Sequence, residues 1–146
     1  MKIRRMNIND YEKVYQLWMS CSGMGLNNLD DSKEEIGRFL NRNPTTCLVA
    51  EEREMIIGVI LAGNDGRRGY IYHTAVSPAY RRQGIAARLL DEAELALKES
   101  GISKIALVVF SKNKEGNAFW EEEGFTSRED LVYRNKAIAE MNRIDT

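Results

Sequence analysis

The amino-acid sequence predicts an α/β (α+β) fold with a mixed central sheet of about seven strands and helices on both faces of the sheet. Three observations indicate this class. The chain has 146 residues, a length typical of one domain, here residues 1–146, that buries a sizeable core. Short apolar runs joined by hairpin-like turns occupy the middle of the chain. A long amphipathic helix separates two such runs, and strand–helix–strand crossovers are normally parallel, so antiparallel and parallel pairs should share one sheet.

The first half of the chain should hold a strand, two helices and a strand hairpin. Polar residues that can cap a helix precede apolar side chains at helical spacing: Asn9 or Asp10 before the first helix, and Ser32 with Glu35 as a capping box for the second. In chain order, we expect a strand over Met1–Met6, a helix over Tyr11–Ser20, a helix that begins at Asp31-Ser32, and strands over Thr46–Glu51 and Met55–Ala62.

The second half should extend the sheet and cross it with the longest helix. An Asp-Gly turn signal within Asn64–Gly69 predicts a second hairpin into the strand Tyr70–Val76. The long helix starts near Ile85, and Gly101 stands at the usual place after its end. In chain order, there follow a strand over Lys104–Phe110, a helix from about Glu115 to Glu123, and a hairpin of Phe125–Arg128 with Leu131–Lys136. The complete order is β-α-α-β-β-β-α-β-α-β-β.

Composition and charge narrow the function classes. Hydrophobic residues make up 43% of the chain, charged residues 29%, and the formal net charge is -1, so no general affinity for nucleic acid or a membrane is expected. No apolar window is long enough for a membrane span, and the N-terminus lacks a signal-peptide core. Cys21 and Cys47 do not make a disulfide framework and are interpreted as packed thiols. The reducing cytoplasm is the simplest location.

One segment predicts a class of ligand. Arg81-Arg82-Gln83-Gly84-Ile85-Ala86 lies between the strand that ends at Val76 and the long helix. A helix start leaves backbone N–H groups unpaired and carries the positive end of the helix dipole. Gly84 and Ala86 keep the approach to these groups open, glycine can adopt unusual backbone angles, and two arginines add positive charge. The segment therefore predicts a site for a phosphate or pyrophosphate.

The element order and this segment resemble the GNAT (Gcn5-related N-acetyltransferase) family. Its acetyl-CoA motif, Gln/Arg-x-x-Gly-x-Gly/Ala, matches the six residues from Arg81 to Ala86. A second family pattern, Asn-x-x-Ala-x-x-x-Tyr-x-x-x-Gly-Phe, is partly present between Asn113 and Phe125. Its ends match, whereas Gly116 replaces the usual alanine and Trp120 the usual tyrosine. The resemblance spans nearly the whole chain.

The resemblance implies an N-acetyltransferase that moves an acetyl group from acetyl-CoA, as co-substrate, to an amine of a small molecule or protein. The amine would attack the thioester directly, with no metal. The pyrophosphate would lie on backbone N–H groups of the Arg81–Ala86 segment, and Val76 N–H would polarise the thioester carbonyl. Asn113 would bind pantetheine, although a helix cap is its other interpretation. The implied donor-binding residues are Ala75, Val76, Arg81, Arg82, Gln83, Gly84, Ile85, Ala86, Asn113 and Trp120.

Three tyrosines are the candidate catalytic residues. A base stands at the positions equivalent to Tyr70 or Tyr72 in several relatives, but a phenol has a pKa of about 10, so these two would hold a water that removes the proton. Tyr72 is equally interpreted as a packing residue. Because an indole cannot act as a practical acid, a water or Tyr133 would protonate the thiolate in place of the residue at Trp120. Tyr133 is otherwise an aromatic residue of a late strand.

His73 is the only histidine of the chain. Alternation along a regular strand puts it on the face opposite the expected acceptor site, so a structural role is predicted. The same alternation places Tyr70, Tyr72, Thr74 and Val76 on one face, and Ile71, His73 and Ala75 on the other. The resemblance places the acceptor pocket at the Gly23–Asp30 loop and the final hairpin.

A second function class remains open from the sequence. Trp120 and the missing acidic base favour a non-catalytic acyl-CoA-binding or regulatory module on the same fold, which amine-dependent thiol release would distinguish from an enzyme. A nucleic-acid-binding domain is disfavoured by the acidic balance and the lack of a basic face. Dimers are common among relatives, which makes a homodimer a further expectation.

Overall fold

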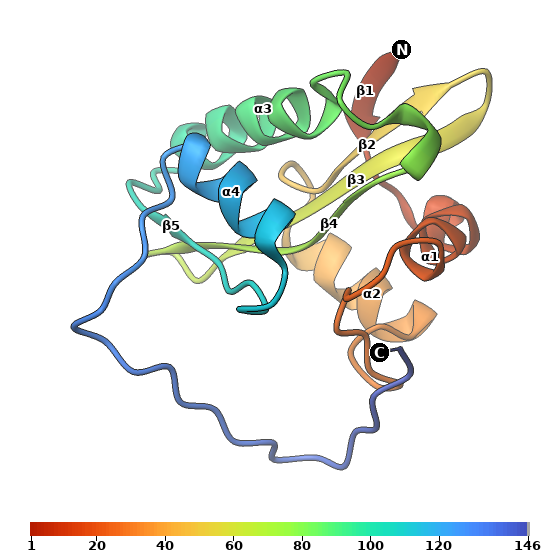
Figure 1. Cartoon of the computed structure of the whole chain (residues 1–146). Coiled ribbons are helices and arrows are strands. Elements are labelled where there is room, and N and C mark those ends of the chain that lie inside the picture. The colour runs from red at the N-terminus through yellow and green to blue at the C-terminus, as the bar shows by residue number, and fades with distance from the viewer. Residues whose placement is uncertain (146) are drawn as a thin grey trace.

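A computed structural model describes residues 1–145 and shows a five-stranded sheet with helices on both faces (Figure 1). Helices α1 and α2 cover one face, and α3 covers the other. The strands are β1 (Lys2–Arg5), β2 (Leu48–Glu52), β3 (Met55–Asn64), β4 (Gly69–Val76) and β5 (Ile105–Ala106). The helices are α1 (Tyr11–Met19), α2 (Lys33–Arg42), α3 (Ile85–Glu99) and α4 (Lys114–Glu122), with 3-10 turns at Ile8–Asp10 and Pro78–Tyr80.

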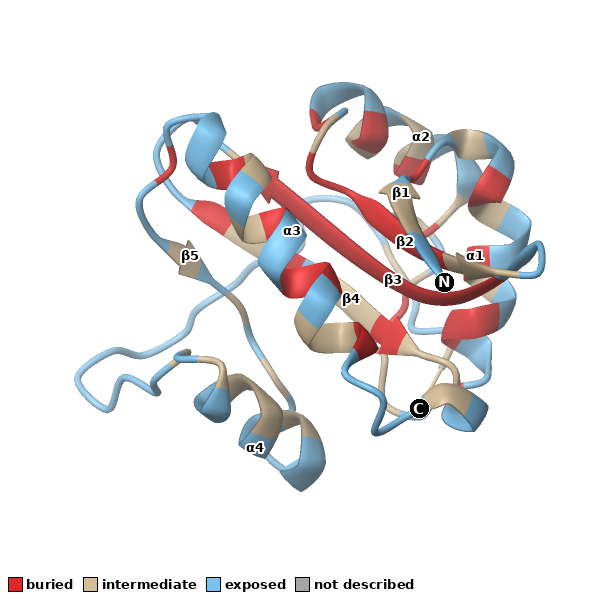
Figure 2. Cartoon of the chain, turned by 90° about the horizontal axis from the view of Figure 1, so that it is seen from above, coloured by how far each residue is buried: buried red, intermediate tan, exposed pale blue. Residues whose placement is uncertain are grey.

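The strands lie in the sheet in their chain order. β1, β2, β3 and β4 pair antiparallel with their neighbours, and β5 pairs parallel with β4 after the α3 crossover. This mixed pattern confirms the fold class expected from the sequence. β3 is almost wholly buried, as its colour in Figure 2 shows, because helices cover both of its faces.

Two apolar cores lie on the two faces of the sheet. Under α1 and α2, the largest fully buried side chain is Trp18, which packs with Val59 and Leu61 of β3. Under α3, Leu89 and Leu90 pack on Ile60. No helix of residues 1–145 is long and apolar enough to cross a membrane.

Helix α2 has the side-chain cap that the sequence predicts, whereas α1 begins at the predicted Tyr11 with a different cap. The Ser32 hydroxyl accepts the Glu35 N–H, which confirms the expected cap. The side-chain cap ahead of α1 is instead Asn7, whose side chain accepts the Asn9 N–H at the start of the 3-10 turn. The carboxylate of Asp10 is engaged elsewhere, because it binds Asn7 N–H and forms an ion pair with Arg4.

The expectation of about seven strands is wrong for the residues described. β5 covers only Ile105–Ala106 of the expected Lys104–Phe110 strand, because β4 pairs with it no further than Tyr70. The expected hairpin of Phe125–Arg128 with Leu131–Lys136 forms no strand. Residues 126–140 are exposed throughout, so they bury little of the apolar surface that stabilises a strand pair.

β4 contains a bulge that reverses its faces. Ala75 pairs with Val59 and Tyr72 with Leu61, so β4 uses three steps where β3 uses two. The extra residue breaks the alternation of side chains. Ile71 therefore packs under α3 and Ala75 under α1 and α2. The face assignment predicted from strict alternation is wrong from His73 onward.

Candidate active site

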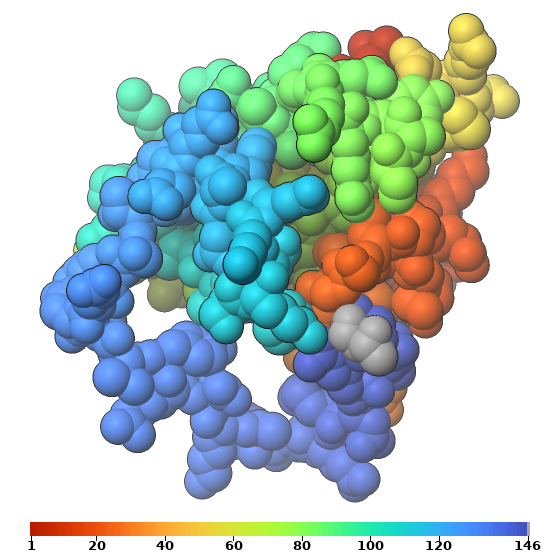
Figure 3. All heavy atoms as spheres, viewed as in Figure 1, coloured from red at the N-terminus to blue at the C-terminus, as the bar shows by residue number. Residues whose placement is uncertain are grey.

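A cleft of about 1600 Å³ runs between the C-terminal half of β4, residues 107–110, α4 and the loop after α1. Figure 3 shows it as a hollow bordered by the cyan, green and orange parts of the chain. It brings together most of the residues that the sequence predicts for the site. Those that line it are Tyr70, Tyr72, Ala75, Val76, Arg81, Arg82, Gly84, Ile85, Ala86, Asn113, Trp120 and Tyr133. Gln83 is exposed and does not line it.

The centre of the cleft is a gap between β4 and the chain after β5. Their pairing ends at Tyr70 and Ala106, and residues 107–110 continue along the cleft without a place in the sheet. Ser77 N–H bonds Ile57 O of β3 at 2.8 Å. Because backbone groups of successive strand residues face opposite edges, the N–H and C=O of Val76 face away from β3, toward the gap. An extended ligand could therefore bind along this edge of β4.

The start of α3 forms the second part of the cleft. Gly84 is the N-cap residue with φ 77°, and Arg82 also has a left-handed backbone with φ 63°. A Cβ at Gly84 would meet nothing within 4 Å, so the glycine is required by its backbone angle and not by lack of space. Within residues 1–145, no side chain caps α3 and no acidic residue lies in its first turn. The N–H groups at this end are therefore available to an anion.

The two arginines ahead of α3 differ in their surroundings. The guanidinium of Arg81 turns back, donating to Val76 O at 3.3 Å and to Cys21 Sγ at 3.6 Å. It thus ties the end of β4 to the end of α1. Arg82 is exposed and makes no side-chain hydrogen bond to the described residues, so it can turn toward an anion on α3.

Asn113 is a helix cap, the second of the two roles that the sequence suggested for it. Its Oδ1 accepts the Gly116 N–H at 2.9 Å and caps α4. Asn117 Nδ2 donates to both Phe110 O and Asn113 O, which fixes the chain between the cleft wall and α4. The cap uses Asn113 Oδ1, and the residue still lines the cleft, so capping does not remove Asn113 from the site.

Trp120 lies on α4 between two other aromatic rings. Its ring centroid is 4.9 Å from that of Phe119 and 5.2 Å from that of Phe125, both edge-on. These contacts hold the indole against the wall of the cleft. The arrangement provides an apolar surface and no acid.

The three candidate tyrosines face the same cleft from two segments. The Tyr70 and Tyr72 rings are 4.8 Å apart on β4, and Tyr72 meets Phe39 of α2 edge-on at 5.8 Å. Burial raises the pKa of both phenols above its ordinary value, and nearby Tyr133 adds to the effect. Neither is therefore a base near neutral pH. Tyr133 is 66% exposed and lies on the unpaired segment after α4, not on a strand.

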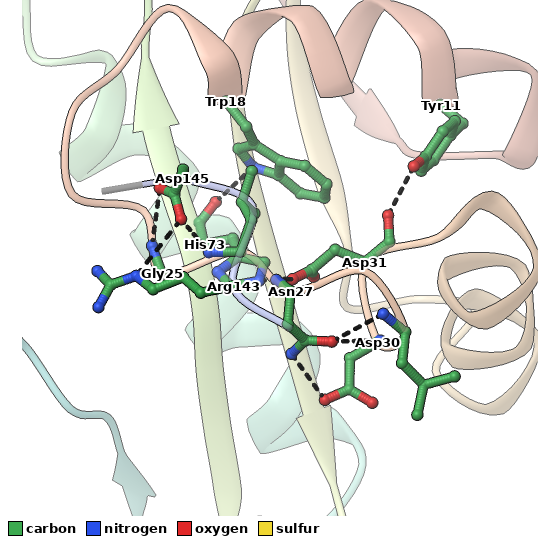
Figure 4. Close-up of polar contacts among 11 residues, drawn as sticks. Tyr11, Trp18, Gly25, Asn27, Asp30, Asp31, His73, Arg143 and Asp145 are labelled. Carbon is green, nitrogen blue, oxygen red and sulfur yellow. Dashed lines mark hydrogen bonds and ion pairs between the residues drawn. The ribbon is translucent and has the colours of Figure 1, made fainter. Parts of the chain in front are cut away.

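The bulge brings His73 to the side of α1. Its ring lies edge-on to Trp18 at 5.2 Å and 6.3 Å from the Tyr72 ring. His73 Nε2 lies 2.7 Å from Oδ1 of Asp31, a carboxylate with only 3% of its side chain exposed (Figure 4). The sequence did not indicate this pair, because the partners are 42 residues apart and the bulge depends on strand pairing.

The loop after α1 is held by the C-terminal end of the chain. The Asp145 carboxylate accepts the N–H groups of Gly25 and Leu26 at 3.1 and 2.7 Å (Figure 4). An isolated antiparallel bridge joins Asn27 to Arg143, whose guanidinium stacks over Phe110. The expected acceptor loop is thus ordered by residues that the sequence analysis did not single out. No signal short of the tertiary contacts would have found them.

A family model, relatives in sequence and solved structures all point to the same protein family. A family model described as the acetyltransferase (GNAT) family matches residues 11–125. An acetyltransferase of Sodalis glossinidius is 34% identical over 140 residues, which cover 96% of this chain and 97% of that protein. Among solved structures, Ard1 from Thermoplasma volcanium aligns with a TM-score of 0.74 at 22% identity, covering 86% of this chain and 82% of that one.

A second solved structure is the PaiA N-acetyltransferase from Thermoplasma acidophilum, in complex with coenzyme A. It aligns with a TM-score of 0.73 at 22% identity and covers 87% of this chain and 90% of that one. At this identity the two solved structures establish the fold, and the family match and the Sodalis relative establish the family. The chain belongs to the GNAT family and is an acetyltransferase, as the motifs of its sequence predicted.

Proposed function

We propose that this enzyme transfers the acetyl group of acetyl-CoA to an amine, with the donor bound along the cleft from α3 to the gap beside β4. The observation that carries the proposal is the alignment of two binding features in one cleft. An uncapped helix start with free N–H groups lies at one end, and an unpaired strand edge continues from it. The first suits a pyrophosphate and the second suits an extended amide-containing arm.

The donor would contact the following groups. The pyrophosphate would accept N–H groups of the Arg82–Ala86 segment, in which Arg82 and Gly84 have the left-handed backbone found in anion-binding turns. The pantetheine arm would run along the edge of β4 beside Val76, whose carbonyl already accepts Arg81, and pass Asn113 and Trp120 on the opposite wall. The thioester would then lie near Val76 N–H, which can donate to the carbonyl oxygen as charge develops there.

The acceptor would enter from the side of α1 and α2. This part of the cleft is lined by Tyr72 and Phe39, with Asp30 and Glu35 nearby. Aromatic faces and carboxylates both attract a protonated amine. We therefore propose an acceptor that binds as a cation and reacts after losing a proton, either a small amine or an amine of a protein.

The test is a steady-state assay of thiol release from acetyl-CoA over a panel of amines, combined with calorimetry of CoA binding. Amine-dependent thiol release above the amine-free rate, together with an acetylated product seen by mass spectrometry, is the expected result. CoA binding without amine-dependent release for any panel member would favour the non-catalytic module instead. A failure to bind CoA would overturn the placement of the donor.

We also propose that the chain forms a homodimer. Support comes from residues 126–140, which are exposed in the chain yet carry apolar side chains of Leu131, Val132 and Ile138 with 59%, 76% and 94% exposure. Exposed apolar side chains gathered in one segment are suited to an interface with a second copy. Light scattering should give twice the mass of 16.7 kDa, and Val132→Glu should shift the distribution to monomer.

A further inference from the structure

The conformation of His73 is strained and is held in place by contacts. Its φ is 44°, in the left-handed region that non-glycine residues seldom adopt, and such strain costs on the order of 1–3 kcal/mol. The Trp18 indole N–H donates to the His73 carbonyl at 3.0 Å and stabilises this turn of the backbone. Strain of this kind, at a residue that lines a reactive cleft, is often retained for function.

Asp31 fixes the orientation of the imidazole. One carboxylate oxygen of Asp31 lies 2.7 Å from His73 Nε2, and the other accepts the Asn27 N–H at 2.8 Å. An ionised carboxylate only accepts hydrogen bonds, so the shared proton belongs to Nε2, and the lone pair of the neutral ring is on Nδ1. Asp31 is thereby a positioning residue for His73.

Nδ1 is accessible to solvent. It makes no hydrogen bond to residues 1–145. Within residues 1–145, Thr74 Oγ1 is the only side-chain N or O atom that is both buried and without a hydrogen-bond partner. Nδ1 has no partner either, so it cannot be buried. His73 has 15% of its side chain exposed, and both His73 and Thr74 line the cleft. A polar ligand atom here could reach Nδ1, whereas the buried Thr74 hydroxyl is not accessible.

The charged groups around the ring come from two further segments. The loop after α1 contributes Asp31 and Asp30, and the C-terminal end contributes Arg143 and Asp145 (Figure 4). On β4 itself the neighbour is the Tyr72 phenol, and from α1 it is the uncharged Trp18 ring. Of these groups, the Asp31 carboxylate contacts the ring directly, and it would stabilise a positive charge that forms there during proton transfer.

We propose that His73 is the general base of the acetyl transfer and that Asp31 holds its ring for this role. The proposal rests on the function proposed above. The ammonium form of the acceptor gives a proton to His73 Nδ1. The freed amine lone pair then forms the C–N bond to the acetyl carbon, and the C–S bond breaks with its electron pair on sulfur. The second amine proton goes to the departing thiolate, and the imidazolium later releases its proton to solvent.

The first experiment reads the tautomer without any turnover. Because the chain has one histidine, the ¹⁵N spectrum of histidine-labelled protein reports on His73 alone. We expect Nε2 to carry the proton in neutral protein and Nδ1 to be bare. In Asp31→Asn the amide N–H would donate to Nε2 and move the ring proton to Nδ1. A proton on Nδ1 in the unmodified protein would overturn the proposal.

The second experiment measures kcat/KM for the acceptor against pH at saturating acetyl-CoA. His73→Gln can still donate to Asp31 but cannot take the proton, so we expect a loss of about 10²–10⁴-fold and the disappearance of the acidic limb of the profile. Asp31→Asn should also lose activity, whereas the matched control Glu12→Gln, which removes an exposed ion pair with Lys33, should not.

The outcomes separate this proposal from the one on which it rests. If His73→Gln keeps more than a tenth of the activity and the acidic limb, the pair only anchors the loop to β4 and the proposal is wrong. If the unmodified protein binds acetyl-CoA but acetylates no amine, the proposed function fails. The tautomer measurement still decides whether His73 presents a bare nitrogen to the cleft.

Discussion

A Cβ atom at Gly116 would lie 2.8 Å from Cγ of Asn113, closer than real Cβ contacts come. Gly116 stands where the family pattern has alanine, and Asn113 is the residue that caps α4 through the Gly116 N–H. The glycine thus lets the Asn113 side chain fold over the first turn of α4. The departure from the family pattern therefore has a local steric cause, and it affects a residue that borders the donor site.

We predict that Gly116→Ala lowers the free energy of unfolding by about 1 kcal/mol, because the new methyl group displaces the cap. The sign should reverse in an Asn113→Ala background, where no amide is in the way and alanine is the better helix former by up to about 1 kcal/mol. Urea unfolding of the four proteins of this cycle measures both effects. Equal effects in the two backgrounds would contradict the steric explanation.

Gly84 and Gly101 provide a matched pair for testing the anion site. Both have left-handed backbones, with φ of 77° and 86°, and a Cβ at either would meet nothing within 4 Å. Alanine at each should therefore cost about 1–2 kcal/mol of stability. Only Gly84→Ala should also weaken CoA binding, by about tenfold, because the N–H groups at the start of α3 would turn away from the pyrophosphate.

Gly84→Glu should weaken CoA binding further, since a carboxylate would repel the pyrophosphate. Calorimetry of CoA binding to the folded variants tests whether the pyrophosphate binds at the start of α3. Equal CoA affinity in the Gly84 and Gly101 variants would argue that the pyrophosphate binds elsewhere.

The parts of the site that were predictable from sequence are those set by local chemistry. A glycine before a long amphipathic helix predicts an open helix start, and Gly84 is indeed the N-cap residue of α3 with no side-chain cap. Ser32 with Glu35 similarly predicted its own cap. The placement of His73 failed because a bulge in β4 depends on how β3 pairs with it. The prediction of a strand over Leu131–Lys136 was wrong because an apolar pattern shows only that a segment can pair. It does not show that a partner strand lies beside that segment.

Thr74 and Thr46 have opposite hydrogen-bonding environments. Thr46 Oγ1 donates to Ala62 O at 2.6 Å, whereas Thr74 Oγ1 is buried without a partner among the described residues. Valine has nearly the same shape as threonine but no hydroxyl. Thr74→Val should therefore raise the free energy of unfolding by about 1 kcal/mol, and Thr46→Val should lower it by about as much.

Thermal unfolding of the two threonine variants compares the signs directly. If Thr74→Val destabilises the protein like Thr46→Val, the Thr74 hydroxyl has a partner, such as a bound water, that contributes to stability. A fall in acetyl transfer with a gain in stability would instead place the hydroxyl in contact with a substrate.

Asp145 should control how tightly the acceptor loop is held. Its two carboxylate oxygens each accept one backbone N–H of the loop, from Gly25 and Leu26. Asn at this position has one acceptor oxygen, so Asp145→Asn loses one of the two bonds and loosens the loop. We predict a several-fold rise in KM for the amine with unchanged affinity for CoA, because the N–H groups that Asp145 holds belong to the loop and not to the start of α3. Asp130→Asn, at an exposed ion pair with Arg128, is the control.

Hydrogen exchange of residues 22–30 should accelerate in the Asp145 variant alone. Unchanged exchange there would mean that the bridge between Asn27 and Arg143 holds the loop without the carboxylate.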